Sequence, residues 1–159
     1  MLYFKTVPFP HGTKQPDVEK ALRRYSLKRT SSLDFKSSAT NVGTDKLFLG
    51  LEGKNSLKFT RLKTSFEVLL PKLIISLSKD QTTAAYRIRL SAIPSALCIL
   101  LLFGVVSIII GLITGNAKLE GVIFVVAMII VFTLLLKLEI RLLLSRVSKC
   151  IKISDNTLP

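Results

Sequence analysis

Two long apolar runs dominate the second half of the chain. Leu90–Thr114 contains no charged residue, and Leu119–Leu136 contains only Glu120, next to its start. A helix that crosses the ~30 Å hydrocarbon core of a bilayer needs about 20 apolar residues. Because each run is close to this length and only a short stub separates them, the pattern predicts a transmembrane helical hairpin over residues 90–136.

Ahead of the hairpin the period of the pattern falls to two, which is typical of strands. Leucines at 47, 49 and 51 alternate with Phe48, Gly50 and Glu52, and the apolar residues of Leu57–Lys63 alternate with polar ones, on either side of a Gly-Lys-Asn turn. Phe66–Ser78 is strongly apolar but is interrupted by Pro71, which indicates a bulge or an edge position, and Thr82–Leu90 alternates again. These four segments predict a four-stranded antiparallel meander.

A short helix precedes this meander in the predicted order of elements. Pro16–Leu27 opens with proline and acidic residues, which suit the first turn of a helix. The Ser- and Thr-rich stretch Thr30–Thr44 follows as a loop or weak edge strand, with Phe35 as its anchor to the core. The predicted fold is therefore an α+β membrane protein: an N-terminal helix and a four-stranded antiparallel meander, then a two-helix transmembrane hairpin with a basic tail.

The same boundaries divide the chain into three parts. Residues 1–89 are predicted to form a cytoplasmic domain of helix and β-meander, residues 90–136 the hairpin with spans 90–114 and 119–136, and residues 137–159 a basic juxtamembrane tail. The tail carries an apolar stripe at helical spacing that includes Leu143, Val147 and Ile151. This stripe either lies in the membrane interface or packs on the β domain, and the second is favoured because a small meander gains from a cover.

The formal net charge of +13 is carried by the two segments that flank the hairpin. Residues 1–90 hold 17 Lys and Arg against seven acids, and the tail holds five against two, whereas the connecting stub Gly115–Glu120 holds one of each and is neutral. Lys and Arg near the ends of membrane helices are enriched on the cytoplasmic side. Both termini are therefore predicted to be cytoplasmic, with the stub on the other side of the membrane.

Two sets of residues are predicted to mediate membrane contacts. Tyr, Lys and Arg suit the headgroup level because each has an apolar body and a polar end, and the predicted membrane-interface residues are Tyr86, Arg87, Arg89, Lys137 and Arg141. Small residues at spacings of three and four let a neighbouring helix approach closely. The predicted helix-packing residues are Gly104, Ser107 and Gly111, facing the second span or another copy of the chain.

Little in the sequence points to catalysis or metal binding. His11 is the only histidine, and the two cysteines, Cys98 and Cys150, form no cluster with metal-ligand spacing. The acids of the β domain are scattered, no phosphate-binding loop is present, and neither span carries a charged residue between its ends. We therefore predict a non-enzymatic protein with no catalytic, cofactor-binding or metal-binding residues.

One stretch of the β domain resembles a known type of protein. Its motif consists of Phe48-Leu-Gly50, Asn55-Ser-Leu57-Lys-Phe59-Thr-Arg61, Ser65-Phe66 and Leu70-Pro71-Lys72. This arrangement, over residues 46–110, is similar to that of uncharacterised small bacterial membrane proteins in which a β-meander precedes one or two apolar helices, although Leu57 stands where they usually have an aromatic residue. The resemblance implies this architecture and a bacterial inner membrane location, and it implies no particular activity.

Two classes of function agree with these features. The favoured one is a membrane-anchored, non-enzymatic module that holds a basic β domain at the cytoplasmic face for interaction with a membrane-protein partner, another copy or anionic lipid headgroups. The alternative is a membrane-tethered nucleic-acid-binding protein, or a small accessory subunit of a transport complex. Nucleic acid would bind through Lys20–Arg29 and the Lys54–Lys63 hairpin, with Lys54, Lys58, Arg61 and Lys63 contacting phosphates. Nucleic acid is the less favoured partner because Phe59 suits a core better than a stacking surface.

Overall fold

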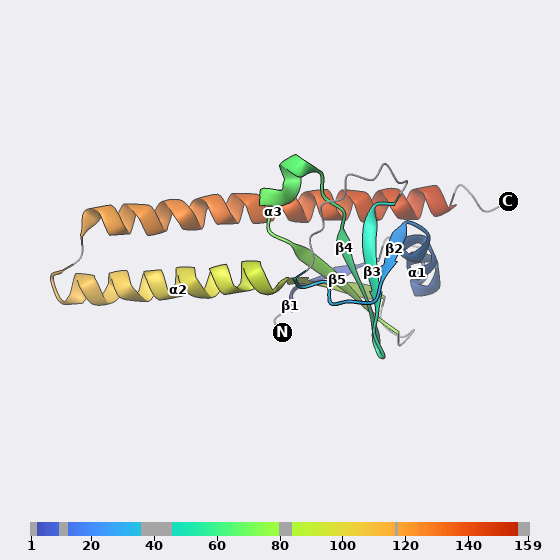
Figure 1. The fold of residues 1–159 in the computed structure, drawn as a ribbon, viewed down its shortest axis with the longest axis horizontal. Coiled ribbons are helices and arrows are strands. Elements are labelled where there is room, and N and C mark those ends of the chain that lie inside the picture. The colour runs from blue at the N-terminus through green and yellow to red at the C-terminus, as the bar shows by residue number, and fades with distance from the viewer. Residues whose placement is uncertain (1–2, 10–12, 36–45, 80–83, 117, 156–159) are drawn as a thin grey trace.

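The computed structural model describes residues 3–9, 13–35, 46–79, 84–116 and 118–155. Its elements, in chain order, are β1 (Tyr3–Pro8), α1 (Gln15–Arg24), β2 (Ser26–Arg29), β3 (Phe48–Glu52), β4 (Ser56–Arg61), the 3-10 helix η1 (Ser65–Leu69), β5 (Leu73–Ser78), β6 (Ala85–Leu90), α2 (Ala92–Ile113) and α3 (Leu119–Asp155). A helical hairpin forms one end of an elongated molecule and a helix-covered sheet forms the other (Figure 1). Helix α3 belongs to both ends.

The sheet has six strands in the order β1-β6-β5-β4-β3-β2. Strands β3 to β6 pair antiparallel with their neighbours in sequence, β1 pairs antiparallel with β6 at one edge, and β2 pairs parallel with β3 at the other. The prediction of an N-terminal helix followed by a four-stranded antiparallel meander is therefore wrong. The sheet is six-stranded and mixed, and a strand precedes the first helix.

Both unpredicted strands lie at sheet edges and have weak sequence signals. β1 ends at Pro8, and an edge position tolerates a residue that has no N–H to donate. β2 has only four residues, and its Lys and Arg continue the basic end of the preceding helix. The helix predicted over Pro16–Leu27 accordingly ends at Arg24, because the last residues of that range pair with β3.

A further correction concerns the approach to β5. The strand predicted over Phe66–Ser78 is wrong in its first half, where Ser65–Leu69 form η1 instead. The Thr64 backbone N–H donates to Glu67 Oε2 at 2.9 Å, one half of a capping box that favours a helical turn here. The turn leaves its apolar side chains exposed, including Phe66 and Leu69.

One face of the sheet packs against α1 and the C-terminal part of α3. The buried residues of this main core are Val18 and Leu22 of α1, Phe48, Leu57, Phe59, Leu73, Ile75, Leu77, Tyr86 and Ile88 of the sheet, and Leu143, Val147, Cys150 and Ile151 of α3. The apolar stripe of the predicted tail therefore packs on the β domain, the favoured of the two alternatives. Covering the sheet removes this stripe from water, which stabilises the domain by the usual hydrophobic term.

The opposite face of the sheet carries a smaller core of Leu33, Leu49, Leu62 and Ile74. Leu33 is 1% exposed, whereas Phe35 is 77% exposed, so the prediction of Phe35 as the anchor of its loop is wrong. The remainder of the predicted loop, residues 36–44, lies outside the described residues.

Helices α2 and α3 run side by side beyond the sheet as a hairpin (Figure 1). α2 has 22 residues, and both helices are long and apolar enough to cross a membrane, as predicted. α2 ends at the predicted turn, where Gly115 has a φ of 72° and the Asn116 N–H donates to Gly111 O at 2.8 Å. α3 continues past residue 136 without a break, so the second predicted span and the predicted tail belong to one helix of 37 residues.

Candidate functional site

The sheet meets the hairpin at a region that we call the junction. It comprises the ends of β4 and β6, η1, the first turns of α2 and the middle of α3. Only Ser91 separates β6 from α2, so the sheet has no flexible tether to the hairpin on that side. In the same region α3 passes from exposed apolar residues such as Leu134 to buried residues such as Leu143. The junction therefore sets the position of the sheet relative to both long helices.

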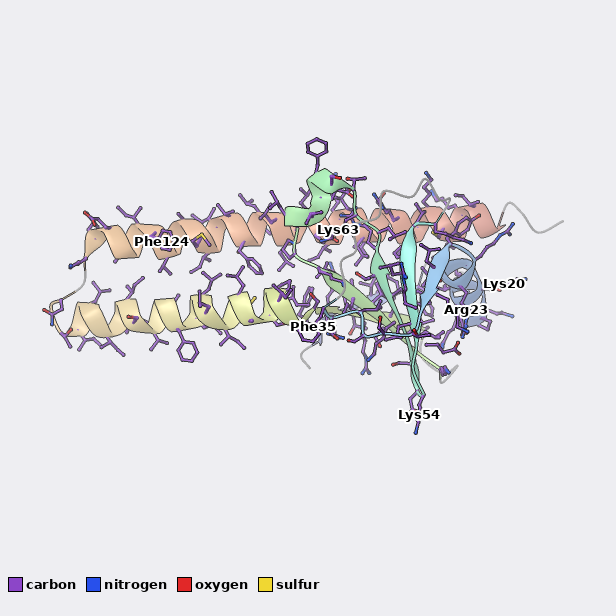
Figure 2. All side chains as sticks on the ribbon, viewed as in Figure 1. Lys20, Arg23, Phe35, Lys54, Lys63 and Phe124 are labelled. Atoms are coloured by element: carbon purple, nitrogen blue, oxygen red, sulfur yellow. The ribbon has the colours of Figure 1, made fainter. Side chains whose placement is uncertain are left out.

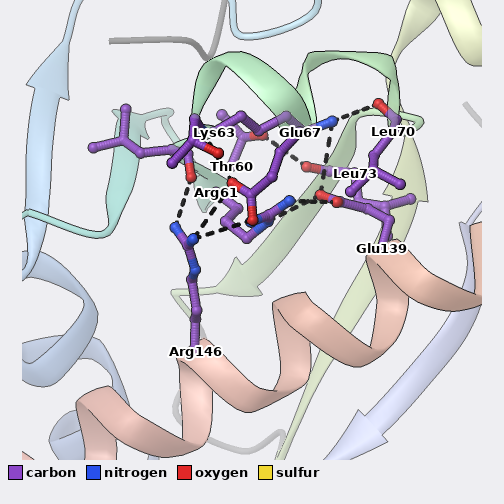
Figure 3. A network of polar contacts seen from close by, with 10 residues as sticks. Thr60, Arg61, Lys63, Glu67, Leu70, Leu73, Glu139 and Arg146 are labelled. Atoms are coloured by element: carbon purple, nitrogen blue, oxygen red, sulfur yellow. Dashed lines mark hydrogen bonds and ion pairs between the residues drawn. The ribbon is translucent and has the colours of Figure 1, made fainter. Parts of the chain in front are cut away.

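A fully buried arginine lies at the centre of the junction. Arg61 lies at the end of β4 on the face that α3 covers, and Figure 3 shows its contacts. Its Nη2 donates to Glu139 Oε2 at 2.7 Å and its Nε donates to Glu139 Oε1 at 3.2 Å. Its Nη1 donates to Glu67 Oε1 at 2.6 Å. Arg61 thus connects one carboxylate of α3 with one of η1, in charge-assisted hydrogen bonds of the strong kind.

Two further cations complete this network. Lys63 Nζ donates to Leu70 O at 2.5 Å and lies 3.8 Å from Glu139 Oε1. Arg146 Nη1 donates to Leu62 O at 2.7 Å, and its Nη2 lies 3.4 Å from Glu67 Oε1. We call Arg61, Lys63, Glu67, Glu139 and Arg146 the ion cluster. Because Glu139 and Arg146 are about two helical turns apart, the cluster fixes both the height and the rotation of α3 on the sheet.

A second buried ion pair lies on the other face of the sheet. Arg89 of β6 is 3% exposed and binds Asp34 through two hydrogen bonds, Nη1 to Oδ1 at 2.7 Å and Nη2 to Oδ2 at 2.9 Å. Next to it, Lys72 Nζ donates to Leu33 O. This planar pairing of guanidinium and carboxylate holds the Thr30–Phe35 segment against the sheet.

The charged groups of the junction have shifted pKa values. Burial by itself would raise the pKa of Glu67, but the Thr64 N–H and the Arg61 guanidinium outweigh it and lower that pKa to about 2. The hydrogen bonds from Arg89 lower the pKa of Asp34, more than burial raises it. Burial lowers the pKa of Lys72 to about 8, and neighbouring Asp34 opposes only part of this effect. At neutral pH the two carboxylates are ionised and Lys72 is mainly protonated.

A cavity of about 410 Å³ opens at the junction between η1, the loop before β5 and the two long helices. Its apolar wall includes Ile93 and Leu97 of α2 and Phe132 and Leu135 of α3. The polar residues that line it are Asp34, Lys63, Lys72 and Ser91. The volume is within the range of small-ligand pockets.

The structure distributes the predicted membrane-interface residues over two environments. Arg87 is exposed in β6, shortly before α2, and Lys137 and Arg141 are exposed in α3, just past its apolar part. Tyr86 is buried in the main core, where its ring stacks on Phe9 at a centroid distance of 6.1 Å, and Arg89 is buried in its pair with Asp34. Contact of this set with a membrane stays a prediction.

The predicted helix-packing residues also differ among themselves. Gly104 lies against α3, and a Cβ at that position would stand 3.3 Å from Val125 Cγ2. Gly111 is half-buried and Ser107 is exposed. Close approach between the helices therefore occurs at Gly104, and lateral association through this set stays a prediction.

The ion cluster was not foreseen, although two patterns in the sequence point to it. Arg61 follows Leu57 and Phe59 in the inward phase of β4, and Glu139 precedes Leu143 and Val147 on the apolar stripe of α3. A charge on an apolar stripe must be paired when the stripe is buried. The patterns indicate buried charges of opposite sign, whereas their pairing depends on the fold.

The residues that could bind a metal or a nucleic acid are placed as follows. Within the described parts of the chain, no group of three or more His, Cys, Asp or Glu side chains could hold a metal ion. His11 lies outside the described residues. Of the residues considered for nucleic-acid contact, Phe59, Arg61 and Lys63 are buried.

The resemblance to small bacterial membrane proteins concerns the segment that contains β3, β4, η1, β5, β6 and most of α2. It stays a prediction about the kind of protein this is. Comparison of the chain with protein-family models, with curated proteins and with solved structures finds no match.

Proposed function

We propose that this chain is a membrane-anchored, non-enzymatic module. In this proposal α2 and the apolar part of α3 cross a membrane, and α3 holds the basic sheet domain at the cytoplasmic face. The observation that carries the proposal is the continuity of α3, because exposed apolar residues and buried core residues belong to one helix of 37 residues. A continuous helix that is clamped by the ion cluster keeps the sheet at a set height above the bilayer.

The distribution of charge supports the cytoplasmic orientation. Both segments that flank the hairpin are basic, and Arg87, Lys137 and Arg141 are exposed near the sheet-side ends of the two apolar segments. Lys and Arg at these positions favour the cytoplasmic side of a membrane. The resemblance described above supports a bacterial inner membrane.

The exposed basic residues also indicate which kinds of partner the module would bind. Exposed Lys and Arg near an anionic leaflet contribute about 1 kcal/mol each to binding. The carboxylates of the junction, Asp34, Glu67 and Glu139, are all bound by arginine, which supports a binding role over acid–base catalysis. We therefore propose anionic lipid or a partner membrane protein as the ligand of this module.

Topology is tested with a matched pair of cysteine variants. Asn116 lies in the turn between the long helices, Asn55 lies in the β3–β4 turn, and both are exposed. In intact bacterial cells, a membrane-impermeant maleimide should label the Asn116→Cys variant and should label the Asn55→Cys variant only after permeabilisation. The unmodified chain, whose Cys98 and Cys150 are half-buried and buried, is the control. Equal labelling of both variants in intact cells would contradict the proposal.

The partner is tested by purifying the intact protein from its native membrane in mild detergent, followed by mass spectrometry. Recovery of the chain with enriched anionic lipid supports a lipid-binding module, and a stoichiometric membrane protein supports an accessory role. Recovery with nucleic acid that is released by moderate salt would contradict the proposal and favour the alternative function.

A further inference from the structure

We propose that the junction cavity binds one anionic glycerophospholipid, with its phosphate at Lys63, Lys72 and Ser91 and its chains along the apolar wall. The inference rests on the proposed function, because a bilayer reaches the cavity only if α2 and α3 cross it. It adds a defined lipid site to a general attraction between a basic surface and an anionic leaflet.

The position of the cavity suits a lipid. Its wall comes from the first turns of α2, through Ile93 and Leu97, and from the last turns of the apolar part of α3, through Phe132 and Leu135. When the hairpin crosses a bilayer, these turns lie where the hydrocarbon meets the headgroups. An occupant with hydrocarbon at one end and a polar group at the other matches a wall that combines apolar side chains of the two helices with Lys63, Lys72 and Ser91.

Exposed apolar side chains surround the cavity on its outer side. Phe35 is 77% exposed, Val68 is 52% exposed and Leu69 is 85% exposed, and all three line the cavity. Figure 2 shows Phe35 at the end of the sheet domain that faces the hairpin. Large apolar side chains grouped in this way mark an interaction surface, and the adjoining acyl chains of a bilayer would cover them.

The charge of the site calls for an anion. Asp34 is the one carboxylate in the described lining of the cavity, and both of its oxygens are already bound by Arg89. Among the described residues of the ion cluster, the Arg89–Asp34 pair and the cavity lining, the cations outnumber the carboxylates by five to three; they are Arg61, Lys63, Lys72, Arg89 and Arg146 against Asp34, Glu67 and Glu139. Buried charge is costly unless it is paired, so a bound phosphate would balance this excess.

An unpartnered hydroxyl provides an independent observation. Ser91 lines the cavity and is 1% exposed, and its Oγ has no hydrogen-bond partner among the described residues. Buried hydroxyls usually have a partner, so this group is placed to donate to a ligand. Ser91 is also the N-cap of α2, a helix of 22 residues whose N-terminus favours negative charge, and the Ala92 N–H at this end already donates to the Asp34 carboxylate. The hydroxyl and the two lysines line the same cavity and are the donors that this inference assigns to the phosphate.

The test compares lipid retention by the full chain and by point variants. Each protein is reconstituted in nanodiscs of phosphatidylcholine mixed with phosphatidylglycerol, extracted in mild detergent and examined by native mass spectrometry. We expect the unmodified chain to retain one phosphatidylglycerol in preference to phosphatidylcholine. We expect Lys72→Gln and Ser91→Ala each to weaken this retention by about tenfold, the scale of a lost hydrogen bond to a charged group. Lys72→Arg should retain the lipid.

Lys54→Gln is the matched control. It removes the same charge at the tip of the β3–β4 hairpin, away from the junction (Figure 2), and should leave retention unchanged. Equal retention by Lys72→Gln and Lys54→Gln would overturn the inference. The inference would also be overturned if inorganic phosphate stabilised the lipid-free protein as strongly as phosphatidylglycerol does. A third contrary result would be a partner protein that is lost from Lys72→Gln while lipid retention is unchanged.

Failure of the inference can be separated from failure of the proposed function. Extraction of the same membranes with alkaline carbonate shows whether the chain is integrally inserted. An unmodified chain that is released by carbonate contradicts the proposed function itself. A chain that stays inserted, with lipid retention independent of Lys72 and Ser91, contradicts only the lipid site. The circular dichroism spectrum of each variant shows whether it is folded.

Discussion

At the scale of single residues, Arg61 is the most constrained side chain of the junction. Its guanidinium is fully buried, and its hydrogen bonds connect Glu67 of η1 with Glu139 of α3. Burial opposes ionisation of Arg61, but the hydrogen bonds to Glu139 and Glu67 raise its pKa overall, so it stays charged in the core. Removing either carboxylate would leave part of this charge without a partner.

A Glu139→Gln substitution tests this arrangement. Gln keeps the shape of the side chain but removes the charge that faces Arg61 and Lys63, so we expect a loss of about 3 kcal/mol in the free energy of unfolding. The measurement is urea unfolding of the detergent-solubilised protein, followed by circular dichroism. Glu120→Gln, at an exposed position near the start of α3, is the control. Equal effects of the two substitutions would show that the buried pair contributes little.

Acid sensitivity is expected to depend on Glu67. Its folded pKa of about 2 lies below the ordinary value of 4.5, so its ionised form favours the folded state. This contribution is fully present above about pH 5 and is lost as the pH falls through the range from 5 to 2. The unfolding midpoint of the unmodified chain should fall more steeply over this range than that of the Glu67→Gln variant. Parallel pH profiles would be evidence against the shift, and the titration of Asp34 is common to both proteins.

At the scale of elements, α3 connects the hairpin with the sheet. Its apolar part packs against α2, where Gly104 allows close approach to Val125, and its C-terminal part covers the main core through Leu143 and Val147. The ion cluster lies between these two contacts. The contact between α2 and α3 therefore lies next to the ion cluster that positions the sheet.

A Gly104→Leu substitution tests the packing of the hairpin. A Cβ alone would stand 3.3 Å from Val125, so a leucine must push the helices apart, at a cost of about 1–3 kcal/mol. We expect a lower thermal unfolding midpoint in detergent. Gly121→Leu is the control, because a Cβ there would have no neighbour within 4 Å. A larger effect at Gly121 than at Gly104 would rule out this packing contact.

At the scale of the whole molecule, exposed apolar surface and charge are separated along the long axis. The hairpin exposes large apolar side chains such as Phe124 (Figure 2), and η1 exposes Leu69, which lines the junction cavity together with Ile93 of α2. Lys54 lies in the sheet domain, at the tip of the β3–β4 hairpin, which projects to the side of the long axis (Figure 2). This order along the axis is suited to a protein whose hairpin lies in a bilayer, whose η1 lies at its surface and whose sheet lies in water.

Single tryptophans would report this order, because the chain contains none. In liposomes that contain brominated lipid, we expect Leu69→Trp to show blue-shifted emission and strong quenching, since residue 69 would lie among the upper acyl chains. Lys54→Trp should show emission typical of an aqueous environment and little quenching. Similar spectra from both variants would contradict the proposed position of η1.

Some of the fold could be predicted because its signal is local. Alternation located β3 and β4 on either side of their turn, and a glycine marked the end of α2. The edge strands β1 and β2 escaped prediction because short edge strands need few apolar residues and receive their hydrogen bonds from distant partners. η1 was mistaken for part of a strand because its apolar residues resemble a strand even though they remain exposed.

The sequence by itself determined that two apolar helices of bilayer length follow one another, because apolar runs of that length satisfy their backbone hydrogen bonds locally when they form helices. It also determined the basic character of the flanking segments. Only the tertiary structure decided which charges meet. Arg61 and Glu139 are 78 positions apart in the chain, and Arg89 and Asp34 are 55 apart. Such pairs form only after β4, β6 and α3 have packed, since no local pattern specifies a distant partner.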